Sequence, residues 1–317
     1  MKIWILVASL LVVVGIVLLL GVAFAADWDI NKLNTAKYQT EEYDIDEDFN
    51  SISVNTDTAD LTLIRSDDGT CRVTCYEETR AAHTVTVIDG VLTVDIEDTR
   101  NWFDRISLFS FENSSITIYL PENEYDLLTV DTSTGDVELR KELKFANIDV
   151  DTSTGDVKCY SSASENIKIE LSTGDVTLEG ISAQAVGISL TTGDVTLEHL
   201  ECAEEINISV TTGRTRLCDV ECKSFVSDGD TGNVVLYNVI AAETLLIERS
   251  TGDIIFDSCD AKEIQIETST GDVEGALLTG KRFDVRTDTG DTEIPESTDG
   301  GLCKITTDTG DIRIYIK

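Results

Sequence analysis

The sequence is poor in proline, in basic residues and in histidine. Only two prolines, Pro121 and Pro295, occur among 317 residues, and no low-complexity linker divides the chain, so one continuous body is the simplest organisation. The chain carries 24 basic against 60 acidic residues, a net charge of −36. This excess of negative charge argues against nucleic acid and anionic membrane surfaces as partners, and favours solubility or attraction of cations. With two histidines, His83 and His199, and no Cys-x-x-Cys pair, the sequence also predicts no zinc site.

A Thr-Gly-Asp tripeptide dominates the second half of the chain. Its glycine recurs every 19 or 20 residues, at Gly135, Gly155, Gly174, Gly193, Gly213, Gly232, Gly252, Gly271, Gly290 and Gly310. A repeat this regular indicates stacked, near-identical units and therefore predicts an all-β solenoid, or β-helix, with rungs of 19–20 residues.

Apolar residues recur at fixed positions around each glycine. The position seven before it is apolar in all ten units, and the position five before it is aliphatic in all but one, which has Ser227. Alternation of apolar and polar residues marks half-buried strands, so each unit is expected to supply two short strands that stack in register with those of its neighbours. Further apolar residues suggest a third corner or short strand, and leave a triangular and a flattened two-sheet cross-section both open: Ile181, Leu200, Val220 and Val239.

The tripeptide has a backbone explanation, because a tight corner needs the positive φ that glycine adopts freely. Asp follows the glycine in eight units, and Arg214 and Asn233 are the exceptions. Each Asp can accept backbone N–H bonds at its corner, or the column can form a row of calcium sites. The candidate calcium ligands are Asp136, Asp156, Asp175 and Asp194. One Asp per corner falls short of six to eight oxygen ligands, which favours the structural interpretation, and no cofactor is predicted.

The segment before the repeat is expected to cap the rod. Residues 52–63 fit the repeat template with Ala59 in the glycine place, and Asp89-Gly90 between alternating apolar residues predicts a hairpin. An aromatic-rich insertion follows, with Trp102, Phe103, Leu108, Phe109 and Phe111. Because open solenoid ends promote aggregation, this insertion is the candidate cap, and a ligand-binding subdomain is the alternative.

The N-terminus is apolar. Residues 3–26 carry no charge over 24 residues, a length that suits a membrane span better than a signal sequence. Lys2 before the segment and acidic residues after it place the N-terminus in the cytoplasm and the body outside, as in a single-pass cell-membrane protein. Ala23-Phe24-Ala25 is also an acceptable signal-peptidase site, so cleavage remains an alternative. The expected organisation is an anchor (1–26), a juxtamembrane linker (27–44), a β cap (45–127) and the solenoid (128–317).

The eight cysteines fit a structural role. Cys159 and Cys303 occupy apolar core positions, and Cys71 and Cys75 are too far apart along one strand to bond each other. Cys202 and Cys222 are expected on adjacent units, where a disulfide and a stacked thiol pair both fit.

One group of apolar residues occupies outward positions of the repeat that are otherwise polar. Exposed apolar clusters usually mark contacts with another molecule. The group consists of Val226, Val235, Leu246 and Ile255. A partner or a second copy is expected to dock there, unless another segment of the chain covers it.

The N-terminal span, Leu120-Pro121 after the aromatic insertion, and the repeated Thr-Gly-Asp-Val motif together resemble a family of bacterial envelope proteins called putative adhesins, a domain of unknown function. The resemblance covers residues 45–317 and implies surface adhesion or envelope sensing, without catalytic residues. A non-enzymatic interaction scaffold is therefore expected, with an envelope protein, a cell-wall glycan or a second copy as partner. The alternatives are a calcium-dependent folding or sensing module and a carbohydrate-active β-helix enzyme, although the outward charges show no convergent catalytic group.

Overall fold

The computed structural model describes residues 2–25, 37–99, 113–297 and 299–317 of the chain. Helix α1 covers Lys2–Ala25, and all other regular elements of the described residues are strands, so the all-β class is confirmed. Judged on the described part of the chain, none of its helices combines the length and apolar character that a membrane span needs. The transmembrane helix expected from the sequence is therefore not supported by the structure.

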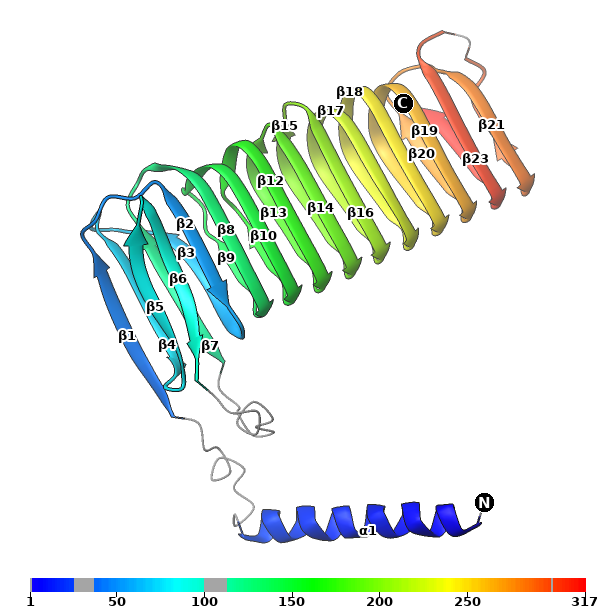
Figure 1. Cartoon of the computed structure of the whole chain (residues 1–317). Coiled ribbons are helices and arrows are strands. Elements are labelled where there is room, and N and C mark those ends of the chain that lie inside the picture. The colour runs from blue at the N-terminus through cyan, green and yellow to red at the C-terminus, as the bar shows by residue number, and fades with distance from the viewer. Residues whose placement is uncertain (1, 26–36, 100–112, 298) are drawn as a thin grey trace.

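The body is a β-solenoid, visible in Figure 1 as a rod of parallel strands that lie side by side. Its strands are β8 (Glu124–Thr134), β9 (Val137–Leu139), β10 (Lys144–Thr154), β11 (Val157–Cys159), β12 (Ser162–Thr173), β13 (Val176–Ala183), β14 (Ala185–Thr192), β15 (Val195–Cys202), β16 (Glu205–Thr212), β17 (Thr215–Thr231), β18 (Val234–Thr251), β19 (Ile254–Thr270), β20 (Val273–Leu277), β21 (Arg282–Thr289), β22 (Thr292–Glu293), β23 (Leu302–Thr309) and β24 (Ile312–Ile316). The solenoid predicted from the repeat is confirmed.

Two sheets enclose one core. Strands that precede a glycine corner pair in parallel with each other, as β8, β10, β12 and β14 do, and strands that follow a corner pair in the same way, as β9, β11, β13 and β15 do. Equivalent repeat positions lie side by side, so Val150 pairs with Val130 on one side and with Ile169 on the other. The inward side chains of both sheets pack into a single hydrophobic cluster.

A second bend lies six residues after the glycine in the middle of the rod. The residue there is left-handed in five successive rungs: Gly180, His199, Asp219, Asn238 and Ser258, with φ between 52° and 66°. The extra residue shifts the alternation by one, as in a β-bulge, so the next apolar residue again points inward. Ile181, Leu200, Val220 and Val239 are all buried and paired, which accounts for the further apolar column seen in the sequence.

The N-terminal end is closed by strands of mixed direction. They are β1 (Tyr38–Ile45), β2 (Ser51–Thr56), β3 (Ala59–Arg65), β4 (Cys71–Glu78), β5 (Ala81–Ile88), β6 (Val91–Asp98) and β7 (Ser114–Leu120). β2 and β3 form a rung directly on β8 and β9, and β6 and β7 stack parallel to that rung. β5 then pairs antiparallel to β6, and β4 pairs antiparallel to β7, so β4 and β5 run against the strands of the rod. β1, at the left end of Figure 1, pairs antiparallel to β4 and therefore runs in the same direction as β7.

The unit expected around Ala59 lies in the rung next to that of Gly135, although 76 residues separate the two in the sequence, because strands β4 to β7 form cap layers on the outer side. The expected linker 27–44 contains most of β1, which pairs with β4 and so covers an edge that would otherwise be open. The aromatic insertion, Trp102 to Phe111, lies outside the described residues.

The last two rungs stack in the reverse of their chain order. β19 pairs with β23 rather than with β21, and β21 pairs with β23 from the far side, so the Gly310 rung lies between the Gly271 and Gly290 rungs. The inward side chains of the two rungs differ in burial accordingly. Cys303 and Ile305 of the inserted rung are fully buried, whereas Phe283 and Val285 of the terminal rung are only half-buried. The more polar rung thus occupies the edge of the sheet, where charged side chains discourage further pairing.

Candidate functional site

Each glycine corner is a point of close backbone approach between rungs. The ten glycines have φ between 135° and 154°, and a Cβ on Gly193 would lie 1.9 Å from the carbonyl oxygen of Gly174 in the rung below. The N–H of Gly174 donates to the carbonyl of Thr192 at 3.1 Å, which ties the same two corners together. Glycine is therefore required both by conformation and by the absence of space for a side chain.

The aspartates after the glycines form a hydrogen-bonded ladder along the rod. Asp136 Oδ1 accepts the backbone N–H of Asp156 at 2.8 Å, and Asp156 and Asp175 accept the N–H of the next aspartate in the same way. Asp194 accepts from Arg214, and Asn233 accepts from Asp253 with its amide oxygen. Each acceptor thus serves the neighbouring rung rather than its own corner. The four candidate calcium ligands all take part in this ladder. Among the described residues, no three of these aspartates have their carboxylate oxygens close enough together to hold one metal ion.

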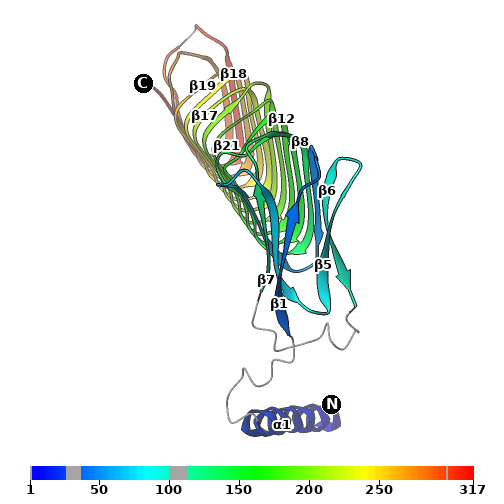
Figure 2. The same cartoon turned by 90° about the vertical axis from the view of Figure 1, so that its left-hand side faces the viewer.

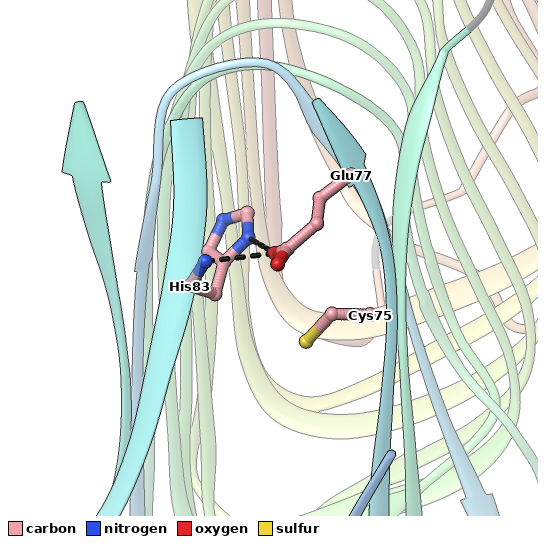
Figure 3. A group of neighbouring side chains, drawn as sticks. All are labelled: Cys75, Glu77 and His83. Carbon is pink, nitrogen blue, oxygen red and sulfur yellow. Dashed lines mark hydrogen bonds and ion pairs between the residues drawn. The ribbon is translucent and has the colours of Figure 1, made fainter. Parts of the chain in front are cut away.

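A buried polar cluster lies in the cap, where β4 faces β5 (Figure 3). Cys75 and Glu77 are fully buried on the inward side of β4, and His83 of β5 is 3% exposed. One carboxylate oxygen of Glu77, Oε2, accepts the backbone N–H of His83 at 2.7 Å and lies 2.8 Å from His83 Nδ1. The ligand atoms of the three side chains lie within 4.8 Å of one another, and in the described part of the chain only this group has three possible metal ligands so close together.

Two hydroxyls complete the surroundings of this cluster. Thr56 Oγ1 lies 2.9 Å from His83 Nε2, and the Tyr43 hydroxyl donates to the His83 carbonyl oxygen at 3.0 Å. The other Glu77 oxygen, Oε1, is buried and has no hydrogen-bond partner. Burial, and next to it the nearby Glu77 charge, raises the pKa of the Cys75 thiol to about 12. A buried carboxylate oxygen without a donor is costly, so this arrangement needs a chemical explanation.

Sequence reasoning missed this cluster, although a signal was present. Glu77 occupies an inward-facing position of a strand whose other inward residues, Cys71, Val73 and Cys75, are apolar in character. His83 occupies an inward-facing position of the next strand. A charged residue at an inward position, two residues from a cysteine and six from a histidine, indicates a buried polar site.

A second buried polar group lies inside the rod. Arg249 is 4% exposed, and its Nη2 donates to Ser227 Oγ at 2.8 Å and to Thr215 Oγ1 at 3.1 Å. Its Nη1 donates to the Glu248 carbonyl oxygen, while its Nε has no partner. Burial lowers the pKa of the guanidinium from its ordinary value. The hydroxyls of Ser227 and Thr215 replace apolar side chains of their columns and serve as its acceptors.

The four apolar residues expected to form an interaction patch lie on both sheets. Val226 pairs with Leu246 in the sheet before the corners, and Val235 pairs with Ile255 in the sheet after them. Because both sheets direct their core side chains inward, the two pairs face outward on different sides of the rod. Ile255 is 37% exposed, and Tyr237, two residues after Val235 and 41% exposed, adds an aromatic ring to the second face.

The cysteines expected on adjacent rungs, Cys202 and Cys222, are both buried and both free thiols in the structure. They line a shallow groove of about 650 Å³ together with Ala183, Glu201 and Glu221. Cys159 and Cys303 lie fully buried in the core, as their columns indicate.

A family model described as Toastrack DUF4097 matches residues 49–214 and 202–317. No curated protein matches the chain. Among solved structures, the chain is similar to a putative adhesin from Bacteroides fragilis, at 16% identity over 89% of this chain and 97% of that chain, with a TM-score of 0.38. It is similar also to a putative lipid binding protein from Parabacteroides distasonis, at 13% identity over 89% and 98%, with a TM-score of 0.49. A putative adhesin from Parabacteroides merdae matches at 14% identity over 76% and 95%, with a TM-score of 0.44.

Proposed function

Because the chain belongs to the Toastrack DUF4097 family, which confirms the resemblance seen in the sequence, we propose that it is a non-enzymatic, adhesin-like scaffold of the bacterial envelope. The apolar N-terminal segment anchors it in the cell membrane, with the N-terminus in the cytoplasm and the rod outside. Its partner is an envelope protein, a cell-wall glycan or a second copy of the chain.

One observation carries this proposal: the residues at the repeated positions hold neighbouring rungs of the rod together. The glycines allow close stacking, the aspartates bridge neighbouring rungs, and the inward columns form the core. What the repeat leaves free is the outer surface of two long sheets, seen side-on in Figure 1 and turned by 90° in Figure 2. A long repetitive surface suits binding to an extended partner better than catalysis.

The outer face of the second sheet is the favoured contact. Val235, Tyr237 and Ile255 bring two branched aliphatic side chains and a phenol together on neighbouring rungs, in a chain whose surface is otherwise strongly acidic. Exposed apolar groups surrounded by polar residues are typical of protein contacts, and tyrosine is common at such contacts.

The test is cross-linked capture from native cell envelopes by the full-length chain. Two double variants, Val235→Asp with Ile255→Asp and Val226→Asp with Leu246→Asp, compare the two faces at one level of the rod. We expect the first double variant to lose a specifically captured protein or glycan and the second to retain it. Equal capture by the wild type and both variants would contradict a contact at this level.

The same preparation distinguishes the alternatives. Capture or thermal stability that requires calcium and is lost in EDTA would favour a calcium-dependent module built on the aspartate ladder. Turnover of wall polysaccharide by the purified chain would contradict the non-enzymatic proposal. Recovery of the chain in the soluble fraction after mild washing of the membranes would contradict the anchor.

A further inference from the structure

We propose that Cys75, Glu77 and His83 form a zinc-binding site inside the N-terminal cap. The site is independent of the outer faces of the rod, and joins two strands that pair with different partners, β4 with β7 and β5 with β6. Figure 3 shows the three side chains directed toward one another between these strands.

The geometry is close to that of a metal site. In a zinc tetrahedron the bond lengths of about 2.0–2.3 Å place the ligand atoms roughly 3.5 Å apart. The three ligand atoms of the cluster already lie within 4.8 Å of one another, so they need to approach by about 1.3 Å at most. Small rotations of the three side chains supply that movement without displacing a strand.

The unpartnered oxygen of Glu77 points to a missing cation. Its Oε2 is held by the backbone N–H of His83 at 2.7 Å, whereas Oε1 is buried without any donor. A zinc ion bonded to Oε1 supplies the interaction that this atom lacks, and leaves the backbone hydrogen bond to Oε2 intact.

The histidine is oriented for ligation by its other neighbour. Thr56 Oγ1 lies 2.9 Å from Nε2 and can accept its proton. Nδ1, which lies 2.8 Å from Glu77 Oε2, can then bind metal in exchange for that contact. Metal-bound histidines usually donate their second N–H to such a partner, which fixes the tautomer and the plane of the ring.

Charge and ligand type select the ion. A thiolate and a carboxylate together balance the charge of a divalent cation, so the loaded site is neutral, as a fully buried site requires. The proton of the Cys75 thiol passes to solvent when the metal binds. Sulfur and imidazole ligands suit zinc and exclude calcium and magnesium, which take oxygen ligands. Three protein ligands leave a fourth position for a water molecule.

The experiment uses the full-length, tag-free chain in detergent, unfolded and then refolded in metal-free buffer with one equivalent of zinc or of cobalt as its spectroscopic substitute. After gel filtration we expect about one metal ion per chain, and for cobalt a thiolate-to-metal charge-transfer band. We also expect the thermal midpoint of the wild type to be higher after refolding with zinc than with EDTA.

Variants place the ion. Cys75→Ser, Glu77→Gln and His83→Asn should each lose the bound metal, and Cys75→Ser should also lose the charge-transfer band. Cys218→Ser and His199→Asn make the same chemical changes on the rod, at a partly exposed and an exposed side chain, and should retain both. Absence of retained metal in the wild type, an unchanged thermal midpoint with zinc, or a band that persists in Cys75→Ser would overturn the proposal. The wild-type measurements decide the matter even if a cap variant fails to fold.

Discussion

Substitution of a corner glycine tests the stacking of the rungs most directly. In Gly193→Ala, the new Cβ would lie 1.9 Å from the Gly174 carbonyl oxygen and 2.7 Å from its carbonyl carbon, at a φ of +139°. Both atoms belong to the backbone of the rung below, so no side chain can turn away to make room. The two corners must separate.

The magnitude follows from what the separation breaks. A residue with a Cβ held at such a φ costs of order 1–3 kcal/mol. Moving the corners apart weakens the bond from Gly174 N–H to Thr192 O and the bond from Asp194 N–H to Asp175 Oδ1, each worth about 1 kcal/mol. We therefore expect the free energy of unfolding to fall by roughly 3–5 kcal/mol.

Gly187 provides the matched control in the same rung, because no heavy atom lies within 4 Å of its Cβ position. Gly187→Ala should change the free energy of unfolding by less than about 1 kcal/mol, and can stabilise the rod by restricting the unfolded chain. Urea unfolding followed by circular dichroism measures both variants, and hydrogen exchange near residue 193 detects opening of single rungs, since solenoids can unfold in parts. If the two variants were equally stable, the close approach at the corners would be refuted.

Three further predictions concern the ladder, the buried arginine and the order of the rungs. Asp175→Asn should keep the urea midpoint, because an amide oxygen replaces the carboxylate as it does in the rung of Gly232, whereas Asp175→Ala should lose about 1 kcal/mol. Arg249→Ala should lower the thermal midpoint and cost about 2–4 kcal/mol, because it leaves a cavity and two buried hydroxyls without their donor; an unchanged midpoint would contradict the buried network. Cysteines at Gln265 and Lys304 should form a disulfide under mild oxidation, whereas cysteines at Gln265 and Asp284 should not, because β19 pairs with β23. Mass spectrometry of the linked peptides measures this. A disulfide between positions 265 and 284 alone would show that the rungs stack in the order of the chain.

The rod was predictable because every rung repeats the same physical solution. A glycine every 19 or 20 residues fixes the corner, and apolar residues at constant offsets from it fix the strands, their phase and their register. Val150 lies beside Val130 because both stand five residues before their glycine. Local pattern and global fold agree at nearly every position, which makes the inference from sequence secure.

The ends of the rod were not predictable in the same way. The Gly290 and Gly310 units carry the same motif, so the sequence does not show which of them forms the exposed end of the rod. Only the stacked structure shows that Cys303 and Ile305 are buried, whereas Phe283 and Val285 are half-buried at the end. The cap has no repeat, and its strands reverse direction. The cluster of Cys75, Glu77 and His83 arises from this reversal, since two strands distant from any repeat position bring their inward residues together.

The interior exceptions to the repeat gather around one side chain. Arg249 stands at a repeat position that most other rungs fill with threonine or an aliphatic residue. The hydroxyls of Ser227 and Thr215 accept hydrogen bonds from its guanidinium, and both residues lie among aliphatic side chains. Gly229 occupies the equivalent position one rung earlier, where a Cβ would lie 2.0 Å from the Val210 carbonyl oxygen and 3.1 Å from Arg249 Nη1. The hydroxyls at Ser227 and Thr215 therefore have a single explanation, a buried cation in the rod.

The exceptions in the aspartate column occur at the same level. Asn233 still accepts the N–H of Asp253, but Arg214 has no acceptor to offer, so the ladder is interrupted once, between these two rungs. The exposed Tyr237 and Ile255 lie on the same stretch of the rod. At this level the sequence departs from its own repeat both in the core and on the surface. Such departures from the regular pattern are expected at functional sites. This coincidence supports the proposal that a partner docks at the middle rungs rather than at the regular ones beside the cap.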